Sequence, residues 1–183
     1  MMELSENVEG ALAGLASPDL ATRVGAVEAL AVCSSAIAAQ VAALFETDEE
    51  ARSLVFERLG RFGSLMVEPM EDVYRKAEDQ GLRRMSASAL TYLGSDVGVP
   101  SLMAALAAGD PDLCMAAITL SSAGVSQAAG PIEEALLACD LSDARTLECL
   151  VSSLRRLNHP MAENVRLRLA GVEPGWLRDS LLG

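Results

Sequence analysis

The most reactive side chains in this sequence are four cysteines and one histidine, and they stand far apart along the chain. Cys33, Cys114, Cys139 and Cys149 form no C-x-x-C pair and match no spacing typical of metal ligands. His159 has no evident catalytic partner, because no serine lies in a G-x-S-x-G motif. We therefore expect core thiols, no metal site and no nucleophilic catalysis.

Two acidic pairs are the remaining candidates for chemistry. Asp110-Pro111-Asp112 and Glu133-Glu134 have the oxygen atoms that a hard cation or an acid–base pair would need. The same positions also suit a helix start and a solvent-facing side of a helix, and the repeat described below favours that interpretation. No G-x-G-x-x-G or G-x-x-x-x-G-K sequence is present to hold nucleotide phosphates. The sequence thus predicts a protein without a cofactor and without enzymatic activity.

The charge of the chain restricts the class of partner. The formal net charge is −12, and residues 1–144 carry 8 basic against 22 acidic side chains. Nucleic-acid binding depends on Lys and Arg at the phosphates, so an acidic body disfavours it and favours a protein partner with a basic surface. In the slightly basic tail, the arginines fit a solvated helix face better than a nucleic-acid contact: Arg155, Arg156, Arg166 and Arg168.

A step of about 31 residues organises the sequence. One phase of this step is occupied by four arginines and a cysteine, separated by 29, 31, 31 and 31 positions: Arg23, Arg52, Arg83, Cys114 and Arg145. Prolines recur at a second phase: Pro69, Pro100 and Pro131. A fixed period filled with helix-forming residues is typical of an α-solenoid, in which each helical hairpin buries its apolar face against its neighbours. With only 3% aromatic residues, the core should consist of alanine and leucine in an all-α fold.

Each repeat should contain two helices joined by a turn. In the first repeat, a helix over 4–16 leads through Ser17-Pro18-Asp19 into a second helix that carries Arg23, and Asp19 should cap that second helix. Gly63 and Gly94 should end two repeats in a left-handed conformation. We expect a single domain over 1–183 with five repeats and a C-terminal cap: 3–33, 35–63, 64–94, 95–125 and 126–157, then 159–183.

These repeats resemble the HEAT-like family. The matching features are Asp-x-x-x-Arg at the second helix, Ala or Ser three residues later, Ala-Leu at six and seven, and Val-Pro or Gly-Pro in the next first helix. The period resembles the short form typified by phycobilisome lyase repeats, over residues 3–157. The resemblance implies architecture more than activity, because scaffolds, regulators, bilin lyase subunits and alkylpurine DNA glycosylases share it. A glycosylase would need a basic concave face with aromatics, which the acidic body lacks.

The resemblance also implies a ladder of Asp and Arg side chains between repeats. Two repeats have lost half of the pair, because Cys114 replaces the arginine and Leu141 replaces the aspartate. If the ladder links neighbouring repeats, Asp110 should bond Arg83 or Arg145. If it runs within repeats, Asp110 should only cap its helix. We favour the contact between neighbours.

The second helices, which the resemblance places on the concave side, suggest a binding surface. Positions one, five and eight after each repeat arginine, or after Cys114 in the fourth repeat, share a helix face, named here the second-helix stripe. From the third repeat onward this stripe is small, hydroxylic and apolar, which suits a partner helix or loop but also suits an empty concave face. The candidate protein-binding residues are Arg84, Ser88, Thr91, Tyr92, Met115, Thr119, Ser122 and Leu150. The sequence thus predicts a non-enzymatic scaffold, adaptor or immunity-type inhibitor, with an accessory subunit of a bilin lyase-like enzyme as the alternative.

Two uncharged stretches bear on the location of the protein. They cover Ala29 to Phe45 and Leu113 to Ile132, each contains paired serines, and Gly130-Pro131 interrupts the second. Buried helices explain them better than membrane spans. The first residues carry Glu3 and Glu6 in place of a basic segment, so we expect no signal peptide and a cytoplasmic protein.

Overall fold

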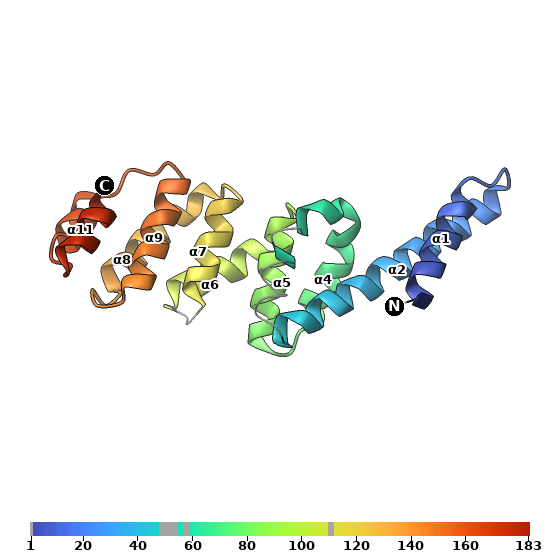
Figure 1. Ribbon diagram of the computed structural model, residues 1–183, viewed down its shortest axis with the longest axis horizontal. Helices are drawn as coiled ribbons and strands as arrows, with labels where there is room; N and C mark the ends of the chain where they lie inside the picture. Colours follow the sequence, from blue (N-terminus) through green and yellow to red (C-terminus); the bar gives the residue numbers. More distant parts are fainter. Residues whose placement is uncertain (1, 48–54, 57–58, 110–111) are drawn as a thin grey trace. The chain divides into compact units, whose positions relative to one another are not determined.

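The computed structural model describes residues 2–47, 55–56, 59–109 and 112–183 (Figure 1). Every regular element in those ranges is helical and none is a strand, as the sequence predicts. The chain divides into two compact units, Met1–Leu93 and Gly94–Gly183, with the boundary at the glycine predicted to end the third repeat. Among the described residues, alanine is the most frequent buried residue in the first unit and leucine in the second, in line with the predicted alanine and leucine core.

The first unit contains a long helix, α2, with partners along its length (Figure 1). The helices bounded by described residues in this unit are α1 (Met2–Leu15), α2 (Leu20–Thr47), the 3₁₀ segment η1 (Leu59–Met66), α4 (Val67–Lys76) and α5 (Gln80–Tyr92). Helix α1 packs on α2, and Gly14 allows a close approach, because a Cβ there would lie 2.9 Å from the Cβ of Ala26. Helices α4 and α5 pack against each other and against α2. Phe45 at the end of α2 stacks on Phe56, with ring centroids 5.2 Å apart.

Helix α2 continues through the boundary predicted between the first and second repeats. After Gly25 it contains neither glycine nor proline, so its Ala-rich sequence has no residue that would end a helix. Ser34 and Ser35 donate to the carbonyls of Leu30 and Ala31 at 3.0 and 3.1 Å, which satisfies both hydroxyls within the helix. The expectation of a break near residue 34 is therefore wrong.

The second unit consists of three helical hairpins in two layers (Figure 1). Its elements are η2 (Asp96–Gly98), α6 (Val99–Ala107), α7 (Leu113–Ser122), η3 (Ser126–Ala128), α8 (Ala129–Ala138), α9 (Ala144–Arg156), α10 (Glu163–Leu169) and α11 (Gly175–Leu182). Helices α6, α8 and α10 pack in succession as one layer, and α7, α9 and α11 as the other. Helices α10 and α11 thus cover α8 and α9, which places the segment predicted as a cap against the last complete repeat.

Aspartates begin the second helix of three hairpins. The carboxylate of Asp19 accepts from the amide of Thr22 at 2.8 Å, and that of Asp79 accepts from Leu82 at 2.8 Å, as predicted for both. The fifth repeat differs from expectation, because Asp143 rather than a residue at the phase of Leu141 caps α9, accepting from the Thr146 amide at 3.1 Å. Asp48 and Asp110, including the predicted rung from Asp110 to Arg83 or Arg145, lie outside the described residues.

Residues with positive φ follow the second helices. Gly94 has φ 84° after α5, which confirms the left-handed backbone predicted there. Gly63 also has a positive φ of 61°, but its ψ is −157° and it lies within η1, so it does not form the left-handed helix end that was predicted. Gly124 has φ 72° after α7, and Asn158 takes the same role after α9 with φ 52°. In these two cases the next amide donates back to the last turn of the helix, which satisfies carbonyls that the helix leaves open.

Three arginines donate to backbone carbonyls at the ends of helices. Arg83 Nη2 donates to the carbonyl of Ala77 after α4 at 2.8 Å. Arg168 of α10 donates to the Cys139 carbonyl after α8 at 2.7 Å through Nη2 and to Leu136 at 3.3 Å through Nε. Arg155 of α9 reaches the last carbonyls of α11 at 2.9 and 3.0 Å. Each contact places a cation at the negative end of a helix dipole and joins two helices.

Candidate functional site

Half of the predicted protein-binding residues on the second helices are buried and form no open surface. Ser88, Thr91, Thr119 and Leu150 are buried, with Leu150 fully inaccessible. The expectation of an accessible concave stripe is therefore wrong at these four residues. The buried hydroxyl of Thr91 has a partner within its own helix, because it donates to the carbonyl of Ala87 at 2.9 Å.

In the second unit, the packing of α7 against α9 explains why this stripe is covered. The hydroxyl of Ser122 on α7 accepts from Arg156 Nη1 on α9 at 2.6 Å, and Cys114 Sγ lies 3.9 Å from the hydroxyl of Thr146. Stripe positions of one second helix thus face the next second helix in the layer. Helical spacing identifies residues that share a face, but it does not say which face the neighbouring hairpin covers.

The other predicted residues remain partly accessible, in two different units. Arg84 and Tyr92 are half-buried in the first unit, where Tyr92 contacts the ring of Phe56 at a centroid distance of 5.6 Å. Met115 is half-buried and Ser122 exposed in the second unit. A role of these four residues in binding stays a prediction.

The two layered helices α7 and α9 bring two predicted core thiols together. Cys149 Sγ donates to the carbonyl of Cys114 at 3.5 Å, and both thiols are half-buried. A hydrogen bond from the Cys149 side chain lowers the pKa of Cys114 to about 6, with a further contribution from Thr146. The same hydrogen bond and burial raise the pKa of Cys149. Cys114 is thus the more nucleophilic thiol of the pair at neutral pH.

Glu133, one member of the acidic pairs, has structural partners in neighbouring elements. Glu133 Oε1 accepts from the Ala162 amide at 2.8 Å, just before α10, and lies 3.6 Å from His159 Nε2. No group of three or more His, Cys, Asp or Glu side chains in the described part of the chain is placed to hold a metal ion. Glu133 therefore connects two hairpins, and only 17% of its side chain is exposed, which differs from the solvent-facing position predicted for it.

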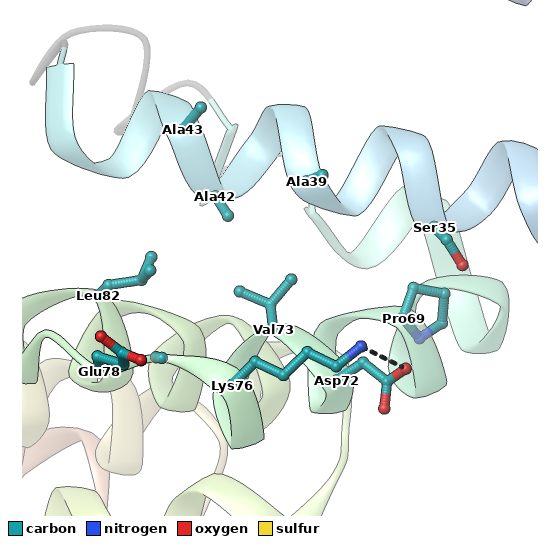
Figure 2. A pocket seen from close by; sticks show the side chains of 11 residues that line it. Ser35, Ala39, Ala42, Ala43, Pro69, Asp72, Val73, Lys76, Glu78 and Leu82 are labelled. Atoms are coloured by element: carbon teal, nitrogen blue, oxygen red, sulfur yellow. Dashed lines mark ion pairs between the residues drawn. The ribbon is translucent and has the colours of Figure 1, made fainter.

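An open groove in the first unit is the strongest candidate site (Figure 2). It has a volume of about 560 Å³ and lies between the C-terminal half of α2 and the α4–α5 hairpin. The α2 wall consists of Ser35, Ala39, Ala42 and Ala43, and the opposite wall and rim of Pro69, Asp72, Val73, Lys76, Ala77, Glu78 and Leu82. Figure 2 shows Ala42, Val73 and Leu82 pointing toward one another across it.

The floor of the groove is apolar and its rim is charged. Ala39 and Ala43 are exposed, and Val73 and Leu82 are half-buried, so apolar surface remains open to solvent. On the rim, Lys76 Nζ lies 3.7 Å from a carboxylate oxygen of Asp72, while Glu78 is exposed. An apolar floor with a few charged groups at its edge is the usual composition of a binding groove.

Sequence reasoning missed this groove. The counting scheme followed the second helix of each repeat, whereas the groove uses the unbroken α2 and the first helix of another hairpin. Small residues at Ser35, Ala39 and Ala43, spaced four apart on α2, were the available signal.

The comparisons with known proteins give no indication of family or function. No family model matches the sequence, and a search of curated proteins finds no relative. Within the described residues, one helical stretch, Leu20–Phe45, is long and apolar enough to cross a membrane, and only 22% of its most apolar window is buried. The expectation that a buried helix explains Ala29 to Phe45 therefore holds only for part of that stretch.

Proposed function

We propose that this chain is a non-enzymatic scaffold that binds an apolar helical segment of another protein. The binding site is the groove between α2 and the α4–α5 hairpin, named here the α2–α4 groove. The observation that carries the proposal is the groove itself, in which alanines of α2 face the half-buried side chains of Val73 and Leu82 on α4 and α5. Small residues let the backbone of an incoming helix approach closely, and Val73 and Leu82 offer contacts to its larger side chains.

The arrangement of helices supports a HEAT-like architecture for the scaffold. In the second unit, first helices pack on first helices and second helices on second helices. Asp19 and Asp79 cap second helices at the phase expected of the family pattern. Such hairpin stacks serve as binding platforms in many proteins, which fits a non-catalytic role.

The charge of the protein defines the flanks of the expected partner. The chain has a formal net charge of −12, and exposed Glu78 stands at the rim of the groove. A helix with an apolar face and lysines or arginines beside it would meet this rim with complementary charge, which speeds association at low salt. Among the described residues that line the groove, none is a cysteine, a histidine or an aromatic, so this lining does not favour the bilin lyase alternative.

A bulky side chain placed in the groove tests the proposal. Ala39→Trp adds an indole inside the groove, while Ala36→Trp adds the same group to an exposed position of α2 that does not line it. Wild-type protein and both variants would be immobilised and exposed to lysate from the native organism, and captured proteins quantified by mass spectrometry. We expect at least one protein retained by wild type and Ala36→Trp and depleted about tenfold or more on Ala39→Trp. Equal capture by all three would refute the groove.

A further inference from the structure

One face of α2 changes from exposed to buried along the helix. Eight residues at alternating steps of four and three define this α2 face: Leu20, Val24, Val27, Ala31, Ser34, Ala38, Val41 and Phe45. The last three are at most 6% exposed, because α4, α5 and η1 pack against this half of the helix. Leu20, Val24 and Val27 are 66%, 49% and 58% exposed. The same apolar face is therefore covered in its second half and open in its first.

Helix α1 does not cover the open half. It packs on a different side of α2, where Ala26 and Cys33 are each 6% exposed. A two-helix hairpin buries only one side of each helix, so the remaining apolar side needs another layer. Seven-residue spacing of apolar residues is the pattern by which helices pack in pairs. The open half thus has the form of a helix–helix contact that lacks its second helix.

We propose that the second helix is α2 of another copy of this chain, packed antiparallel about a two-fold axis between residues 25 and 26. Under this symmetry Val24 faces Val27 of the second copy, and Leu20 faces Ala31. The large leucine is matched with a small alanine and valine with valine, so one surface complements itself. The contact is independent of the α2–α4 groove, since it uses none of the groove's lining residues.

The fold of the first unit selects the antiparallel direction. A parallel second helix would run along the α2 face toward Ala38 and Phe45, where α4, α5 and η1 already lie. An antiparallel helix instead runs beyond Leu20, away from these elements. The orientation therefore follows from which half of the face is already occupied.

A lipid occupant fits these observations less well. A membrane span over Leu20–Phe45 would require Ala38, Val41 and Phe45 to leave the core of the unit. Arg23 and Glu28 flank the open half and are both exposed, and an acidic chain is repelled by anionic lipid surfaces. A narrow apolar face between charged residues suits a helix better than a bilayer.

The first test is the concentration dependence of molecular mass. A contact of about four residues per copy is small, and such interfaces are weak, so sedimentation equilibrium should extend to high protein concentration. We expect the mean mass to rise from 19.2 kDa toward twice that value. Val27→Asp should weaken association about tenfold or more, because it buries a carboxylate in each copy. Val32→Asp, which changes a valine 70% exposed on another side of α2, should leave it unchanged.

The second test distinguishes the directions of packing by disulfide trapping. Residues 20 and 31 are about 16 Å apart along a helix, so in the antiparallel pair neither position meets its own copy. Leu20→Cys and Ala31→Cys should each fail to cross-link alone, whereas a mixture of the two should form a mixed disulfide between these positions, located by mass spectrometry. Cross-linking of Leu20→Cys with itself would indicate parallel packing and overturn the proposal. The proposal would also be overturned if the wild-type protein stays monomeric and binds anionic vesicles, and if Val27→Asp abolishes that binding. This result would assign the α2 face to lipid.

Discussion

Arg168 joins two hairpins of the second unit, and its removal should destabilise that unit. Its guanidinium donates at 2.7 Å to the Cys139 carbonyl and at 3.3 Å to that of Leu136, both at the C-terminal end of α8. Hydrogen bonds that involve a charged group contribute about 1.5 to 3 kcal/mol when buried. Arg168 is only half-buried, so solvent reduces this value. We expect Arg168→Ala to lower the free energy of unfolding by about 1 to 2 kcal/mol.

The matched control is Arg166→Ala, an exposed arginine on the same helix, which should change stability by less than about 0.5 kcal/mol. Arg168→Lys should fall between them, because an ammonium group cannot donate in a planar fork to two carbonyls. Urea unfolding followed by circular dichroism and by Trp176, which lies in α11, would measure all three variants. Equal stability of the Arg166 and Arg168 alanine variants would refute the assigned role.

Three further predictions follow from local geometry. Iodoacetamide should modify Cys114 before Cys139 at pH 7, with a rate that falls as the pH drops through about 6, because the pKa of Cys114 is lowered and burial raises that of Cys139; equal rates by mass spectrometry would contradict this. Gly124→Ala should destabilise the protein by about 1 to 2 kcal/mol, because the φ angle of Gly124 is positive. Gly10→Ala inside α1, where an added Cβ meets nothing within 4 Å, should stabilise the protein by about 0.5 to 1 kcal/mol. Urea unfolding tests both signs. Hydrogen bonds from Thr146 hold the pKa of Asp143 below 3.8, so the stabilisation that the Asp143 carboxylate provides should be present above that pH and disappear as the pH falls further. The difference in melting temperature between wild type and Asp143→Asn should therefore shrink in acid. A difference that grows in acid would argue against the cap.

Local features of this fold could be predicted from the sequence. The helix over 4–16 corresponds to α1, and the turn at Ser17-Pro18-Asp19 and the caps at Asp19 and Asp79 occur as expected. The positive φ angle of Gly94 was also predictable. Each of these depends on residues within one turn of backbone, where the preferences of aspartate, proline and glycine decide the conformation.

Features that depend on distant segments could not be predicted. The unbroken α2 has the same alanines that a repeat boundary would contain, and only the absence of glycine or proline after Gly25 marked the difference. Asp143 was missed because the repeat phase directed attention to Leu141. The α2–α4 groove and the contact of Arg168 with α8 join elements far apart in sequence, and backbone carbonyl acceptors have no signature in the side chains.

The central claim, that the α2–α4 groove binds an apolar helix with basic flanks, is tested most directly by selecting ligands from a displayed library of helical peptides. Wild-type protein should enrich peptides with an apolar face bordered by lysine or arginine. Those peptides should bind Ala36→Trp as they bind wild type and lose about tenfold or more in affinity for Ala39→Trp, where the new indole occupies the groove. Selected peptides that bind Ala39→Trp as tightly as wild type, or the absence of any enriched sequence, would contradict the account.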